Sequence, residues 1–233
     1  MIKLPVVVLL ALASVSTAGR RVVLDPGHGG SNAGAAGSGL REKHLTFALS
    51  GQIAERLRAK GIEVTLTRTA DVTRTLRQRG EVAAAHAADV FVSIHANASP
   101  TRTQRGYETF VLTTRGVDVD GRALRSDSSL PRPGVDREIG LLLDDVERGA
   151  VQWEAADLAA RIQRAIRDRR GASGDRGVRQ DSHHVLLGAT MPAVLVEVGF
   201  VDHPIEGKEL ALPAVQAQLA DAIAAAIEDQ LAD

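Results

Sequence analysis

Residues 90–97 are Val90-Phe91-Val92-Ser93-Ile94-His95-Ala96-Asn97, an apolar run of strand length with a histidine, His95, at its end. A continuous apolar run is typical of a strand that is covered on both faces, as in a parallel sheet. A second run, residues 22–26, leads in the same way to Gly27-His28-Gly29-Gly30. Ligands of open α/β folds bind at the edge where the strands end. The two histidines therefore suggest a metal site at that edge.

Strands and helices alternate along most of the chain. Apolar runs and alternation predict strands at residues 21–25, 62–66, 90–94, 107–112, 185–187 and 193–198. Apolar residues at four-residue spacing predict helices at residues 42–60, 73–87, 151–166 and 215–227. We expect a single α/β domain, with a mostly parallel twisted sheet of about six strands and helices on both faces.

The alternation is interrupted at residues 114–148. The first part, residues 114–137, is rich in Asp, Arg, Ser, Gly and Pro and has no clear periodicity. Structureless loops longer than about 12–15 residues are usually functional or disordered. Residues 139–145 then form a short apolar and acidic segment, which we expect to be a short amphipathic helix.

Composition and the N-terminus limit the function classes. The chain has 233 residues, a formal charge of −1 and no cysteine, so we expect one core, no nucleic-acid partner and no disulfide framework. Aromatic residues make up 3%, which argues against a lectin-like module. Residues 1–18 predict a signal peptide, because Lys3 precedes a short apolar run and the small residues Ser16 and Ala18. The alternative is a buried N-terminal strand.

Two glutamates stand where a metal site or its base would need them. Glu197 lies within the apolar run at residues 193–198, where a carboxylate is costly to bury unless it is paired or bound to a metal. Such burial predicts a raised pKa, which suits a general base, although a buried ion pair is the alternative. Glu42 opens the first long helix, where an acidic residue is also favourable without any further role. His28 and His95 could likewise be satisfied by hydrogen bonds alone.

Four segments, in order and with suitable spacing, resemble the zinc-dependent N-acetylmuramoyl-L-alanine amidases of the amidase type 3 family. They are residues 24–30, 39–43, 93–97 and 192–200, with supporting matches at 66–68, 105–110 and 176–178. The similarity covers about residues 21–230. Each segment alone is modest evidence, but four in register are specific.

The resemblance implies one Zn²⁺ per chain, with His28, Glu42 and His95 as ligands and Glu197 as the catalytic glutamate. Two imidazoles and one carboxylate leave an open position for water. The implied enzyme is secreted to the periplasm or cell wall and has no transmembrane span after signal cleavage. It hydrolyses the amide bond between N-acetylmuramic acid and L-alanine of peptidoglycan, in cell-wall remodelling or daughter-cell separation.

The resemblance also suggests how the enzyme is organised and regulated. Residues 19–233 would form a catalytic domain, expected to be monomeric. Some members of the family carry an inhibitory helix in an insertion near the active site, so residues 114–148 are a candidate regulatory lid on which a protein activator would act. A disordered loop followed by a surface helix is the alternative. Two other functions remain open at this point: a zinc peptidase that cuts within the stem peptide, and a catalytically silent wall-binding protein.

Overall fold

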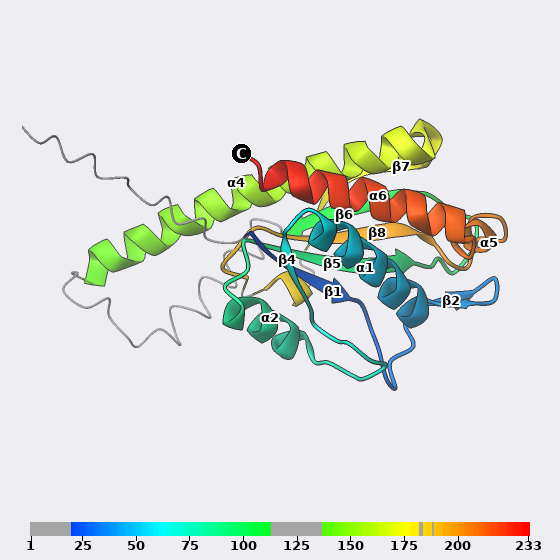
Figure 1. The fold of residues 1–233 in the computed structure, drawn as a ribbon, viewed down its shortest axis with the longest axis horizontal. Coiled ribbons are helices and arrows are strands. Elements are labelled where there is room, and N and C mark those ends of the chain that lie inside the picture. Colours follow the sequence, from blue (N-terminus) through cyan, green and yellow to red (C-terminus); the bar gives the residue numbers. More distant parts are fainter. Residues whose placement is uncertain (1–19, 113–136, 182–183, 188) are drawn as a thin grey trace, which may run out of the picture.

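The computed structural model describes residues 20–112, 137–181, 184–187 and 189–233. The fold is built around a six-stranded sheet (Figure 1). Along the sheet the strands follow the order β4-β1-β5-β8-β6-β7. They are β1 (Arg21–Pro26), β4 (Glu63–Leu66), β5 (Val90–Asn97), β6 (Tyr107–Leu112), β7 (Asp175–Asp181) and β8 (Ala193–Phe200). All neighbouring pairs are parallel except β6 with β8. The expected α/β fold with a mostly parallel sheet is confirmed.

Helices cover both faces of this sheet, as expected (Figure 1). One face carries α1 (Glu42–Ala59), α4 (Arg137–Arg170) and α6 (Pro213–Gln230). These three helices enclose the larger core, to which α1 contributes the fully buried row Leu45, Leu49, Ile53 and Leu57. The other face carries α2 (Leu76–Ala85) and the short 3₁₀ turn η2 (His184–Leu186), with a smaller core. Within the described residues, no helix is long and apolar enough to cross a membrane.

Short elements join these layers near the ends of the strands. The ribbon of β2 (Ala36–Gly37) and β3 (Leu40–Arg41) leads directly into α1. The 3₁₀ turn η1 (Ala172–Gly174) connects α4 to β7, and α5 (Glu206–Leu210) follows β8. Because β1, β5 and β8 are parallel neighbours, their carboxyl ends meet at one edge of the sheet. This edge receives the segments that carry His28, His95 and Glu197.

Several predicted helices have different bounds in the structure. The helix predicted at residues 73–87 is α2, Leu76–Ala85, because Thr75 caps it through its side chain and forms a capping box with Gln78. The short helix predicted at residues 139–145 and the helix predicted at 151–166 are one continuous element, α4. Residues 114–136 of the candidate lid lie outside the described residues.

Two predictions about strands were wrong. Residues 185–187 were expected to form a strand, but residues 184–186 form the 3₁₀ turn η2. Val185 and Leu186 are buried there, and so short an apolar run does not distinguish a strand from a buried turn. Strand β7 was not predicted at all. Its sequence is polar because it lies at the edge of the sheet, where all seven of its residues are exposed or half-buried.

Candidate metal centre

His28 stands in a tight loop directly after β1. Its own φ is 61°, and Gly29 and Gly30 also have positive φ values, of 122° and 58°. A residue other than glycine adopts this left-handed conformation only where its surroundings hold it. The imidazole Nδ1–H donates a hydrogen bond to Asn32 Oδ1 at 3.0 Å. A neutral His28 therefore keeps its lone pair on Nε2, the nitrogen that faces Glu42.

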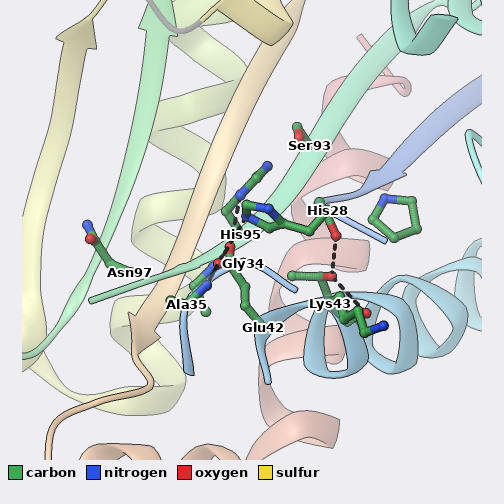
Figure 2. A network of polar contacts seen from close by, with 12 residues as sticks. His28, Gly34, Ala35, Glu42, Lys43, Ser93, His95 and Asn97 are labelled. Carbon is green, nitrogen blue, oxygen red and sulfur yellow. Dashed lines mark hydrogen bonds and ion pairs between the residues drawn. The ribbon is translucent and has the colours of Figure 1, made fainter. Parts of the chain in front are cut away.

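Glu42 joins the two histidines through its carboxylate (Figure 2). Its Oε2 lies 3.0 Å from His28 Nε2, and its Oε1 lies 2.9 Å from His95 Nδ1. The backbone N–H groups of Ala35 and Ala96 donate to the same two oxygens, at 2.7 and 3.0 Å. Burial alone would raise the pKa of Glu42, but the hydrogen bonds from His28 and His95 outweigh it and lower the pKa to about 2. Glu42 is thus held as a carboxylate.

The start of helix α1 positions the Glu42 carboxylate next to the two histidines. Strands β2 and β3 turn the chain so that the Glu42 N–H donates to Ala35 O at 2.8 Å and the Lys43 N–H donates to Ala33 O at 3.2 Å. The side chain of Glu42, with 4% of its surface exposed, then reaches both rings. Burial alone would lower the pKa of His28, but its hydrogen bond to Glu42 raises the pKa above 6.5.

The three side chains fit a metal ion. One potential ligand atom from each of His28, Glu42 and His95 lies within 4.8 Å of the others. Two imidazole nitrogens and one carboxylate oxygen are a common donor set for zinc. Two glycines make room for them: a Cβ on Gly27 would lie 2.5 Å from the His95 ring, and one on Gly34 would lie 2.5 Å from Glu42 Oε2. The surrounding backbone is therefore fitted to these three side chains.

Glu197 lies on the strand next to His95. The two residues are directly paired in the register of β5 and β8. Glu197 Oε2 is buried and has no hydrogen-bond partner within the described part of the chain. Burial, reinforced by the negative charges of Glu42 and Glu108, raises the pKa of Glu197 well above 4.5. A buried carboxyl oxygen without a partner is unusual and is typical of a functional group.

Glu108 continues the row on the other side of Glu197, with which it is paired across β6 and β8. It is 3% exposed and accepts hydrogen bonds from two side chains, Asn97 Nδ2 at 3.2 Å and Arg176 Nε at 3.0 Å. Arg179 Nε forms an ion pair with it at 2.7 Å. Glu108 is therefore a paired carboxylate beside an unpaired one, which singles out Glu197 as the carboxyl group available for chemistry.

A comparison with protein families matches the chain, over residues 22–229, to N-acetylmuramoyl-L-alanine amidase. The chain belongs to this amidase family. It is 34% identical over 215 residues to the N-acetylmuramoyl-L-alanine amidase AmiA of Salmonella typhimurium, and the match covers 88% of this chain and 74% of that relative. The protein is accordingly a hydrolase of the amidase class.

Solved amidase structures agree with the fold. The N-acetylmuramoyl-L-alanine amidase from Clostridium difficile 630 superposes with a TM-score of 0.72 at 28% identity, covering 92% of this chain and 98% of that one. The amidase AmiC2 of Nostoc punctiforme gives 0.69 at 29% identity, covering 91% of this chain and 97% of that one. The amidase domain of this chain thus accounts for nearly the whole of both solved chains.

Some residues around the site were not singled out from the sequence. Asn32 orients His28 and lies in a stretch with no periodic or charge signal of its own. Glu108 flanks Glu197; its segment was expected to be a strand and matched the family pattern, but nothing in it marked Glu108 itself. Arg68 belonged to a segment matched only as part of the family pattern. Its role and that of Arg79 become visible in the fold, where both guanidinium groups are buried beside the His28 loop.

Proposed function

We propose that this amidase is a secreted, zinc-dependent enzyme that hydrolyses the bond between N-acetylmuramic acid and L-alanine in peptidoglycan. The observation that carries the proposal is the group of His28, Glu42 and His95 beside Glu197, whose Oε2 is buried and has no hydrogen-bond partner among the described residues. Three protein ligands, rather than four, are typical of catalytic zinc sites. Export would be directed by residues 1–18, which lie outside the described residues.

His28, Glu42 and His95 would hold one zinc ion. When bound, zinc supplies Lewis acidity, which makes a nearby water more acidic and stabilises negative charge on the amide oxygen. Glu197 would accept a proton from the attacking water while the water oxygen adds to the lactyl carbonyl carbon. The same carboxyl group would then give the proton to the nitrogen of L-alanine as the C–N bond breaks. The products are a glycan strand and a free stem peptide.

The test is mass spectrometry of purified peptidoglycan after digestion, with and without a zinc chelator. We expect intact stem peptides with a free L-alanine amine, and none when the chelator is present. Fragments cut inside the stem would instead identify a zinc peptidase. Binding to the wall without any release of peptide would identify a silent wall-binding protein, for which an unpaired carboxyl oxygen beside the ligand set has no use.

We further propose that residues 114–148 restrict access to the site until a protein activator binds them. Replacing this stretch by a short Gly/Ser linker should raise the basal rate of dye release from labelled peptidoglycan. A second variant replaces it by a Gly/Ser segment of equal length, which preserves the loop-closure entropy while removing any specific contact, and its basal rate should rise as well. Unchanged basal rates in both variants, with normal zinc content, would leave the stretch as an ordinary surface insertion.

A further inference from the structure

The loop that carries His28 is held through its backbone carbonyl groups. Each carbonyl oxygen from residue 26 to residue 30 accepts a hydrogen bond from a side chain. These donors come from elements that are distant in sequence: the first turns of α1, the loop after β4, and α2. We call them the carbonyl clamp. Its members are Lys43, Thr46, Arg68, Thr73 and Arg79.

Two buried arginines make most of the clamp. Arg79 donates from Nη1 to Pro26 O at 2.9 Å and from Nη2 to His28 O at 2.8 Å. Arg68 donates from Nε to Pro26 O at 3.0 Å and from Nη2 to Gly27 O at 3.1 Å. Their exposed fractions are 4% and 1%. Burying a guanidinium group is costly unless its donors are used, and here the loop carbonyls use them.

Arg79 also ties the loop to the strand that bears the second histidine. It forms an ion pair with Asp25, which is fully buried. The other oxygen of Asp25 accepts a hydrogen bond from Ser93 Oγ at 2.7 Å. Ser93 stands two residues before His95 on β5, and side chains two apart lie on the same face of a strand. The Asp25–Arg79 pair therefore connects both histidine-bearing segments.

We propose that Arg79 and Arg68 are positioning residues of the metal centre, which fix His28 in its left-handed conformation and so aim Nε2 at Glu42. This inference rests on the proposed zinc function. The conformation of His28 is disfavoured in isolation, so removing the donors lets the loop relax. Neither arginine touches the ligand atoms, and their effect reaches the metal through the backbone of the loop. Groups that orient metal ligands typically change metal affinity about 10–100-fold when they are replaced.

The test is the zinc affinity of Arg79→Lys, measured by competition with a chromogenic chelator. A lysine keeps the charge next to Asp25 but offers a single compact donor head, which cannot replace the planar fork that reaches two carbonyls and a carboxylate. We expect the Kd for zinc to rise about 10–100-fold. The matched control is Arg77→Lys on the same helix, whose side chain is 89% exposed and pairs with Glu81; its zinc affinity should not change.

Circular dichroism and the Tm of the metal-free proteins separate positioning from folding. A folded Arg79→Lys variant with lower Tm but normal zinc affinity would overturn the inference and leave the proposed function standing. If Arg79→Lys does not fold, Thr46→Val decides, because it removes a hydroxyl of the clamp that donates to Gly27 O at 2.9 Å and accepts from Arg68 Nη2 at 3.4 Å, while leaving both arginines in place. Weaker zinc binding in that variant supports the clamp, and normal binding overturns it. A wild-type protein that binds no zinc overturns both proposals.

Discussion

Replacing Glu197 with glutamine is expected to lower peptidoglycan hydrolysis by about 10²–10⁴-fold, the usual contribution of a general acid–base. Zinc content should stay at one ion per chain, because Glu197 lies outside the proposed ligand set. The amide cannot accept a proton from water at neutral pH, yet it has nearly the same shape as the carboxyl group. Dye release from labelled peptidoglycan gives the rate, and elemental analysis gives the zinc content.

The same substitution should change stability in a direction that depends on pH. Because the folded-state pKa of Glu197 is raised, its stabilising contribution is complete below about pH 4.5 and is lost as the pH rises through the folded-state value. Glutamine does not ionise, so its contribution to stability does not decrease as the pH rises. In metal-free protein, the Tm of Glu197→Gln minus that of the wild type should therefore increase as the pH rises from 4 to 8.

The control for both measurements is Glu63→Gln, which changes an exposed glutamate on β4. It should alter neither the rate nor the pH dependence of Tm. Near-wild-type hydrolysis by Glu197→Gln would show that Glu197 is not the general base. A Tm difference that is flat with pH would contradict the raised pKa of Glu197.

The parts of the fold that could be predicted are those whose sequence reflects burial. Strands β1, β5 and β8 are covered on both faces and therefore appear as apolar runs, and α1 and α6 show their buried rows at four-residue spacing. Strand β7 was missed because an edge strand needs no apolar pattern when solvent covers it. Helix α4 was predicted as two separate helices, because residues 139–145 do not continue the apolar row of residues 151–166.

The candidate site was predictable to different degrees for similar reasons. His28 and His95 follow apolar strands, so their place at one edge of a parallel sheet is a consequence of topology. Glu42 gave no local signal beyond its position at a helix start, and only the resemblance assigned it a role. The fold adds that β2 and β3 return the chain so that this carboxylate contacts both imidazole rings. The carbonyl clamp joins residues distant in sequence, which no local pattern can indicate.

Replacing Glu42 with glutamine should remove both zinc and activity. Glu42 accepts a backbone N–H on each of its two oxygens, from Ala35 and Ala96, while facing both histidines. Glutamine has one acceptor oxygen and one NH₂ group. The NH₂ group would therefore face a backbone N–H from which it cannot accept a hydrogen bond. The charge that favours a cation is lost as well. We expect zinc affinity to fall more than 100-fold, beyond the range of about 10–100-fold for groups that only orient ligands.

The metal-free form of this variant should also be less stable, by about 1–3 kcal/mol, because one buried backbone donor is left without an acceptor. Glu55→Gln, on the exposed side of α1, is the matched control and should change neither zinc binding nor Tm. A Glu42→Gln protein with one zinc per chain and wild-type turnover would exclude Glu42 from the ligand set. The two glutamates are thus separable by experiment: loss of turnover with zinc retained identifies the base, and loss of both identifies the ligand.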